Sequence, residues 1–230
     1  MLKVEKLIYS INNRNILNDI TIDLEAGQSL CLFGKNGSGK SSLLKCISGI
    51  NPIDEGTVKI SGEQSHDRLP FYSSLGCFFN ENGFYHYLTI EENYKVFLTY
   101  YKMEKQEIYK AIKEYAGAFE LNDLLNKKIK HLSAGQKQRA SLALTYMHQP
   151  KLLLFDEPLN NLDAYFIDLF YSITRSYIEE NTAATIIVNH DILSTPDWVN
   201  KIALIENARL IMTNNTQTNI EAVYKSIIQK

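Results

Sequence analysis

The sequence has few cysteines and no long hydrophobic run. Its three cysteines, Cys31, Cys46 and Cys77, stand far apart within apolar stretches, so we expect neither disulfides nor a zinc site and interpret them as reduced core residues. The N-terminal stretch MLKVEKLIYSI is interrupted by charges where a signal peptide needs an apolar core. No apolar run reaches the about 18 residues of a membrane span. We therefore expect a soluble, cytoplasmic chain without a membrane span of its own.

The sequence also lacks a charge bias. Its 24 Lys and Arg residues nearly balance 26 Asp and Glu residues, and no run of like charges suggests a basic or acidic tail. Nucleic acid is therefore not an expected partner. Internal repeats and Pro/Gly-rich linkers are absent as well, and 230 residues are consistent with one large α/β domain or with one domain that carries a small subdomain.

A glycine-rich loop is the most informative feature that is present. The octapeptide GKNGSGKS at 34–41 follows an apolar run, predicted as a strand at 29–33, and opens a predicted helix at 42–50. Backbone N–H groups of such a loop and the positive end of the helix bind phosphate. In this pattern Lys40 reaches the β- and γ-phosphates and the Ser41 hydroxyl holds Mg²⁺. The candidate nucleotide-binding residues of the loop are Gly34, Lys35, Asn36, Gly37, Ser38, Gly39, Lys40, Ser41 and Ser42.

The rest of the chain alternates strands with helices. Short strands are predicted at 3–8, 20–24, 29–33, 57–60 and 75–79, and again at 151–155 and 184–188. Helices are predicted at 105–119, 133–148 and 164–180, with Thr89 and Glu92 forming a capping box for another. A last helix is predicted to start at Thr218. This order predicts an α/β fold with a mostly parallel sheet and a helical insert in the middle.

Two strands of this predicted sheet end in polar residues. The run LLLF at 152–155 leads to Asp156 and Glu157, and the strand at 184–188 leads to His190. If the strand at 151–155 neighbours the strand at 29–33, its carboxylates emerge beside the phosphate loop. Asp156 is then a candidate Mg²⁺ ligand and Glu157 a candidate catalytic base, with His190 able to bond the γ-phosphate and fix Glu157. An ordinary acidic strand end and a structural histidine are the alternative interpretations.

A second short motif identifies a resemblance. LSAGQ at 132–136 opens a predicted helix with Ser133 as its N-cap and Gln136 at the capping-box position, which a well-capped helix alone explains. The order of GKNGSGKS, LSAGQ, LLLFDEP, NNLD and a strand-end histidine nevertheless resembles the ABC-type ATPases over essentially the whole chain. The resemblance implies a phosphate-loop NTPase core and an N-terminal antiparallel β subdomain at about 1–83 and 150–230. It places the helical insert with the signature helix at about 84–149, all within one ATP-binding domain at 1–230.

The resemblance also implies a shared active site. In this family two domains pair head to tail, and each ATP lies between the phosphate loop of one and the signature of the other. The partner subunit's contacts to the nucleotide would then come from Ser133, Ala134, Gly135, Gln136 and Asp163. Ala134 replaces the commoner glycine, a small change.

Two positions depart from the family pattern. The glutamine that touches Mg²⁺ aligns with Asn80, so the implied metal set is Ser41, Asn80 and Asp156, and the shorter amide leaves its reach to the metal open. The aromatic residue that stacks on adenine lies near position 11, which is Ile11. Tyr9 on the same strand face is the adenine candidate, with no stacking as the alternative.

The function implied by the resemblance is that of a transporter ATPase subunit. ATP and Mg²⁺ are the expected cofactors, and the expected partners are a second copy or a paralogue and membrane-spanning permease subunits, which would hold the chain on the inner face of the cell membrane. The short segment after His190 and the stretch GFYHYLTIEEN favour export over import. The alternatives are a soluble ATPase of an assembly system, such as an iron–sulfur cluster scaffold, and an ATP-gated clamp with little turnover.

Overall fold

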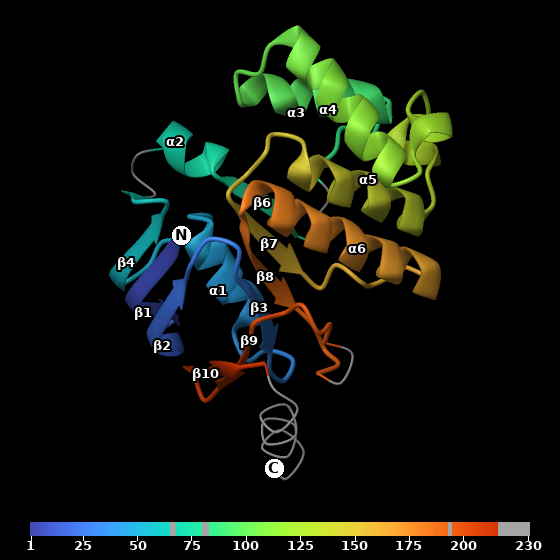
Figure 1. The fold of residues 1–230 in the computed structure, drawn as a ribbon. Helices are drawn as coiled ribbons and strands as arrows, with labels where there is room; N and C mark the ends of the chain where they lie inside the picture. The colour runs from blue at the N-terminus through green and yellow to red at the C-terminus, as the bar shows by residue number, and fades with distance from the viewer. Residues whose placement is uncertain (65–67, 80–82, 193–194, 216–230) are drawn as a thin grey trace.

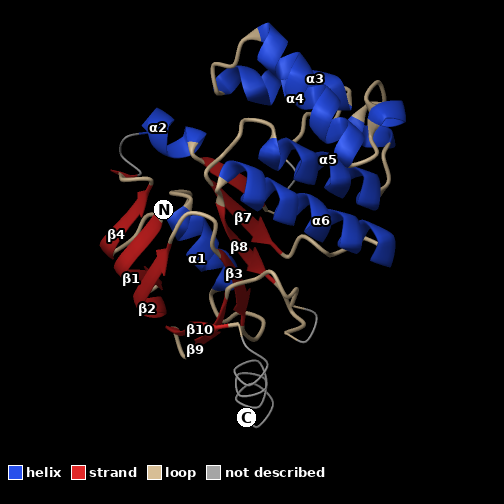
Figure 2. Cartoon of the chain, viewed as in Figure 1, coloured by secondary structure: helices blue, strands red, loops and turns tan. Residues whose placement is uncertain are grey.

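The computed structural model describes residues 1–64, 68–79, 83–192 and 195–215. These residues form an antiparallel sheet, a mostly parallel sheet and a group of helices beyond it (Figures 1 and 2). Within this described part, no helix is long and apolar enough to cross a membrane.

The antiparallel sheet is formed near the N-terminus. Its order is β2-β1-β4-β5, with strands β1 (Leu2–Ile11), β2 (Arg14–Leu24), β4 (Glu55–Ile60) and β5 (Glu63–Gln64). Asn12 and Asn13 both have positive φ, 51° and 62°, as a tight two-residue hairpin turn requires, and asparagine tolerates this conformation. The turn makes both strands longer than the sequence predicted.

The second sheet has six strands in the order β10-β9-β3-β8-β7-β6. Four are β3 (Ser29–Phe33), β6 (Leu75–Phe78), β7 (Leu152–Asp156) and β8 (Ala184–Val188). The edge is formed by β9 (Lys201–Glu206) and β10 (Arg209–Asn214), and only β10 runs antiparallel to its neighbour. Every residue of β3, β7 and β8 is buried, because both faces of the sheet are covered.

Two hydrophobic cores cover these two faces. One core places α1 (Lys40–Ile47) between the two sheets, through residues such as Leu43 and Leu44. The other packs α5 (Ala134–Tyr146) and α6 (Ala164–Asn181) on the opposite face, against Phe33 and Phe155 (Figure 1).

One of the remaining helices precedes β6 in the chain, and the others lie in the insert between β6 and β7. They are α2 (Arg68–Ser73), α3 (Ile90–Tyr100) and α4 (Lys105–Ala118), with short 3-10 turns η2 (Asn122–Leu124) and η3 (Ile129–His131). Thr89 and Glu92 form the predicted capping box, with backbone-to-side-chain bonds of 3.1 and 2.7 Å. Such a cap contributes about 1 kcal/mol.

The predicted fold class is confirmed: an α/β core with a mostly parallel sheet, an N-terminal antiparallel sheet and a helical insert. The prediction omitted α2, β5, β9 and β10. β9 and β10 are joined by a tight turn at Asn207 and Ala208, both with positive φ. This turn was not predicted because it contains no glycine. The helix predicted from Thr218 lies outside the described residues.

Candidate functional site

The glycine-rich loop joins β3 to α1. Gly39 is the N-cap residue of α1 with φ of 109°, a conformation open to glycine. A Cβ at this position would lie 3.1 Å from the Ile16 carbonyl oxygen and 3.1 Å from Leu17 Cδ2, so β2 presses closely on the loop. The first backbone N–H groups of α1 therefore face the loop without a side-chain cap, which is the arrangement that binds an anion.

Lys40 points back into this loop. Its Nζ donates hydrogen bonds to the carbonyl oxygens of Gly34 at 2.8 Å and Lys35 at 3.2 Å, and the side chain is 5% exposed. Burial lowers the pKa of Lys40, whereas the carboxylates of Glu157 and Asp156 act to raise it. The ammonium group is thus held inside the loop with two acidic side chains close by, positioned to meet a phosphate.

The two polar strand ends meet at this loop, but not through the expected strand pair. β7 is not a neighbour of β3, because β8 lies between them. Since β3, β8 and β7 are all parallel, their carboxyl ends share one edge, and His190 follows the end of β8 by two residues. His190 Nε2 lies 2.9 Å from Glu157 Oε1. The predicted histidine and glutamate are therefore brought together.

Glu157 is held in a fixed conformation. Its φ is 53°, a left-handed value that is uncommon for a non-glycine residue, and its Oε2 accepts a 3.0 Å bond from Asn160 Nδ2. Partial burial acts to raise the pKa of Glu157, but hydrogen bonds from His190 and Asn160 outweigh it and the net pKa is lowered. The side chain is thus an ionised acceptor at neutral pH.

A polar cavity of about 440 Å³ joins these groups. It is large enough to hold a polyphosphate together with water. Its lining residues come from the N-terminal hairpin, the phosphate loop and the two strand ends: Ile11, Ile16, Asn36, Gly37, Gly39, Lys40, Ser41, Ser42, Glu157 and His190.

Asp156 and Ser41 fit a magnesium ion. Asp156 Oδ1 is buried and has no hydrogen-bond partner among the described residues, which leaves a hard oxygen acceptor beside the loop. Burial raises the pKa of Asp156, a hydrogen bond from Ser41 lowers it, and the Glu157 charge raises it. A divalent cation would compensate this buried carboxylate, and oxygen ligands are those that Mg²⁺ prefers. The third expected ligand, Asn80, lies outside the described residues.

The signature residues lie apart from this cavity in the same chain. Ser133 is the exposed N-cap of α5, where its Oγ accepts from Gln136 N at 3.2 Å and Gln136 Oε1 accepts from Ser133 N at 3.0 Å. Asp163 is the N-cap of α6, where its side chain accepts one hydrogen bond, from Phe166 N at 3.0 Å. None of the residues 132–136 or Asp163 is among the residues that line the cavity. Both groups are free to face another molecule.

The adenine contact expected at Tyr9 is not supported by the geometry. Tyr9 packs against the core between the two sheets and does not line the cavity, whereas Ile11 and Ile16 do. The bulges of β1 between Leu7 and Ser10 shift the alternation of side chains, so a simple period-two count from Ile11 fails. Ile16 was missed because no motif marks it; its position opposite Gly39 is a tertiary relationship.

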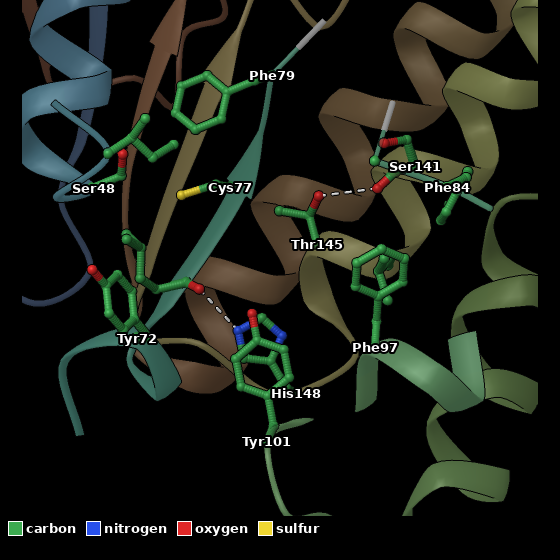
Figure 3. A pocket seen from close by; sticks show the side chains of 14 residues that line it. Ser48, Tyr72, Cys77, Phe79, Phe84, Phe97, Tyr101, Ser141, Thr145 and His148 are labelled. Atoms are coloured by element: carbon green, nitrogen blue, oxygen red, sulfur yellow. Dashed lines mark hydrogen bonds between the residues drawn. The ribbon is translucent and has the colours of Figure 1, made fainter. Parts of the chain in front are cut away.

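A second, more apolar cavity of about 300 Å³ lies between the parallel sheet and the helical insert. Figure 3 shows its lining, with Tyr72 and Cys77 on one side, Phe97 on the other, and Tyr101 over His148 between them. Tyr101 stacks on His148 at 3.9 Å between ring centroids. We call this second cavity the apolar groove. Phe79, the residue before Asn80, is one of its lining residues.

Comparisons with known proteins agree with the motifs. The pattern of the ABC transporter family matches residues 17–160, more than half of the chain. A sulfate/thiosulfate import ATP-binding protein of Nocardia farcinica is 31% identical over 210 residues, which are 91% of this chain and 63% of that protein. A thiamine import ATP-binding protein of Histophilus somni is 29% identical over 203 residues, 88% of this chain and 94% of the relative. The chain thus spans less than two thirds of the length of the first relative.

The fold has close counterparts among solved structures. A dimeric ATP-binding cassette in a post-hydrolysis state, bound to ADP and phosphate, superposes with a TM-score of 0.83 at 23% identity, covering 93% of this chain and 98% of the other. This likeness shows the shared fold. Together with the family match, it leads to one conclusion: the chain belongs to the ABC transporter family and is an ABC-type ATPase domain.

Proposed function

We propose that the chain binds ATP with Mg²⁺ at the phosphate loop, hydrolyses it, and thereby drives a transporter whose membrane-spanning subunits are separate proteins. The observation that carries this proposal is the 2.9 Å pair of His190 and Glu157 at the edge of the cavity that Lys40 also lines. A phosphate cradle, an ionised carboxylate and a histidine in one cavity are the parts that water attack on a terminal phosphate requires.

The residues have separate roles in this proposal. Lys40 and the N–H groups at the start of α1 bind the β- and γ-phosphates. Ser41 and Asp156 would hold Mg²⁺, which neutralises developing charge on the phosphate oxygens. Glu157 accepts the proton of the attacking water, and His190 fixes the Glu157 carboxylate through its Nε2 bond and contacts the terminal phosphate.

A second ATP-binding domain would complete the site. The signature residues Ser133 to Gln136 and Asp163 are placed away from the cavity of their own chain, and the start of α5 offers N–H donors to a partner's nucleotide. We therefore propose a head-to-tail dimer, of two copies or of this chain with a paralogue, that closes on two ATP molecules and reopens after hydrolysis.

The apolar groove is the proposed docking site for a helix of a permease subunit. Its aromatic lining, with exposed Tyr72, Tyr85 and Ile50 at or near its rim, suits an apolar helix face. Docking there would hold the chain at the inner face of the cell membrane. Motion of the insert on dimer closure would then be passed to the permease.

The comparisons do not support the sequence-based expectation for the direction of transport. Export was expected, but the two relatives named above are import proteins, so export is not supported. The relatives are transport proteins, and neither the assembly ATPase nor the clamp is favoured by them.

Two measurements test the proposed function. Purified full chain should release phosphate from ATP only with Mg²⁺, and it should show ATP-dependent dimerisation in solution. Affinity purification of the tagged chain from native membranes should recover a protein with several membrane-spanning helices. Absence of ATP turnover would refute the ATPase, and recovery of soluble partners alone would refute the transporter.

A further inference from the structure

Gln138 connects the signature helix to the loop that carries Glu157. It lies two residues after the signature on α5, and the residue is 5% exposed. Its Nε2 donates a 2.6 Å hydrogen bond to the Pro158 carbonyl oxygen, and its Oε1 accepts a 3.3 Å bond from Asn161 Nδ2. Both ends of this buried amide are therefore used, and both bind the same short loop.

The loop itself has little freedom of its own. The ring of Pro158 fixes its own φ angle. Glu157, the residue before it, and Asn161, three residues after it, have positive φ values of 53° and 61°. Asn160 Nδ2 bonds back to Glu157 Oε2 at 3.0 Å. A shift of the Pro158 carbonyl is thus passed directly to the Glu157 carboxylate, because they belong to adjacent residues.

The packing between α5 and this loop is also close. A Cβ at Gly135 would lie 3.1 Å from the Asn161 carbonyl oxygen, so the signature turn and the loop are nearly in backbone contact. Arg139, the residue after Gln138, lies over the Phe166 ring of α6 with its guanidinium carbon 4.0 Å from the ring centroid. The first two turns of α5 therefore clamp the segment from Pro158 to Phe166.

A buried glutamine needs a reason at this helix position. An apolar side chain would fill the space without the cost of removing an amide from water, and an amide is favourable only where both of its groups are satisfied. Gln138 satisfies both groups of its amide through hydrogen bonds to the loop, at Pro158 and Asn161. Its benefit is the defined position of that loop.

We propose that Gln138 is a positioning residue that makes the placement of Glu157 depend on the position of the signature helix. The proposal rests on the proposed function, in which α5 contacts the partner's ATP while Glu157 acts on the ATP of its own chain. Movement of α5 on closure then sets Glu157 through the Pro158 carbonyl. Turnover in one site would thereby become faster when the other site is occupied.

The test compares two variants of the full chain. Gln138→Met keeps length and packing but removes both hydrogen bonds. Thr174→Val is the matched control: Thr174 is a fully buried hydroxyl that bonds Tyr146 and the Phe170 carbonyl within the core, away from the Glu157 loop. Both variants lose buried hydrogen bonds, so thermal denaturation first establishes that they fold.

The first readout needs no nucleotide. Hydrogen–deuterium exchange of the free chain should accelerate about tenfold at the amides of 159–163 in Gln138→Met, since one buried hydrogen bond of ordinary strength corresponds to about that factor. The same amides should exchange at the wild-type rate in Thr174→Val. Equal exchange in wild type and Gln138→Met overturns the link.

The second readout separates positioning from folding. Gln138→Met should lower kcat about tenfold and bring the Hill coefficient for ATP close to 1, with the ATP Kd within about twofold of wild type. A parallel loss of kcat in Thr174→Val, or an unchanged kcat and Hill coefficient in Gln138→Met, overturns the proposal. Absence of turnover in the wild type counts against the proposed function, and the exchange result still decides whether Gln138 holds the loop.

Discussion

His190 Nε2 lies 2.9 Å from Glu157 Oε1, although the two residues follow different strands of the parallel sheet. Because β8 lies between β3 and β7 and all three strands are parallel, His190 and Glu157 follow strands that end at the same edge of the sheet as the phosphate loop. The arrangement gives the carboxylate a defined rotamer and lowers its pKa. This geometry has measurable consequences for ATP binding and turnover.

Glu157→Gln should bind ATP with nearly wild-type affinity and hydrolyse it at least about 100-fold more slowly, because the amide cannot accept the proton of water. ATP binding and phosphate release are measured on the same preparation. Asp168→Asn, which removes an exposed carboxylate of α6, is the control for the change of charge and should leave turnover unaltered. Turnover of the glutamine variant near the wild-type value would remove Glu157 from its role.

Lys40→Ala should abolish tight ATP binding. Its ammonium is the buried cation inside the phosphate loop, and without it the loop carbonyls of Gly34 and Lys35 lose their donor. The affinity is expected to fall at least about 100-fold, the size of effect expected for a charge-assisted contact with a polyphosphate. Calorimetry checks this, with the exposed Lys113→Ala on α4 as control. Undiminished affinity contradicts the phosphate-loop assignment.

A mixture of two inactive variants tests whether the site is shared. Ser133→Asp keeps a good N-cap for α5 but adds a negative charge where the partner's phosphates would lie. A heterodimer of Ser133→Asp with Lys40→Ala contains one site with both residues intact and one with both altered. The mixture should therefore regain ATPase activity that neither variant shows alone. If mixing restores nothing while both chains still form the heterodimer, the nucleotide is not shared in this way.

The stability of the protein should depend on pH through His148. Burial lowers the pKa of His148 to about 4, although its ring nitrogen donates to the Leu75 carbonyl oxygen at 2.9 Å. Between the ordinary value of 6.5 and about 4 the unfolded chain binds the proton and the folded chain does not, so stability falls as the pH falls through this window. From pH 7 to pH 4.5 the loss due to His148 should be about 2 kcal/mol.

Urea unfolding of wild type and His148→Gln at the two pH values isolates this term. Glutamine can keep the donor to Leu75 but does not titrate. Its free energy of unfolding should therefore fall less over this range than that of the wild type, and equal slopes in the two proteins would show that His148 is not the source.

Gly39→Ala should destabilise the phosphate loop more than Gly37→Ala. Both glycines have positive φ, 109° and 77°, but only a Cβ at Gly39 meets a backbone atom, the Ile16 carbonyl oxygen at 3.1 Å. A left-handed residue costs about 1 kcal/mol or more, and the contact at Gly39 should add about 1 to 2 kcal/mol. The difference between the two unfolding free energies measures how firmly β2 holds the loop. Similar values for both variants argue against that contact.

Part of the site could be predicted from the sequence because it depends on residues that are close together in the chain. The phosphate loop, the acidic end of β7 and the capped start of α5 are each contiguous, and their turns, caps and buried strands follow from nearby residues. The strands β3 and β8 were predicted with their observed ends, since a fully buried strand is a short apolar run between polar residues.

Other features depend on contacts between distant segments. Ile16 lines the cavity because β2 lies against the phosphate loop. Tyr9 does not line it, because the bulges of β1 change which face the side chain occupies. The strands β9 and β10 were missed because the turn that joins them has no glycine, and because only β9 pairs with β3 and is buried while β10 is largely exposed. In the sequence Gln138 is an ordinary helical residue, and its hydrogen bonds to Pro158 and Asn161 are found only in the tertiary structure.

The sequence alone therefore determined the family to which the chain belongs, and it predicted the residues that we propose do the chemistry. Lys40, Ser41, Asp156, Glu157 and His190 stand in motifs whose spacing is set by single turns and strand ends. Only the tertiary structure decided the strand order, with β8 between β3 and β7, and hence the contact between His190 and Glu157. The physical reason is that a motif specifies the local backbone, whereas a distance between side chains on different strands depends on how the whole sheet packs.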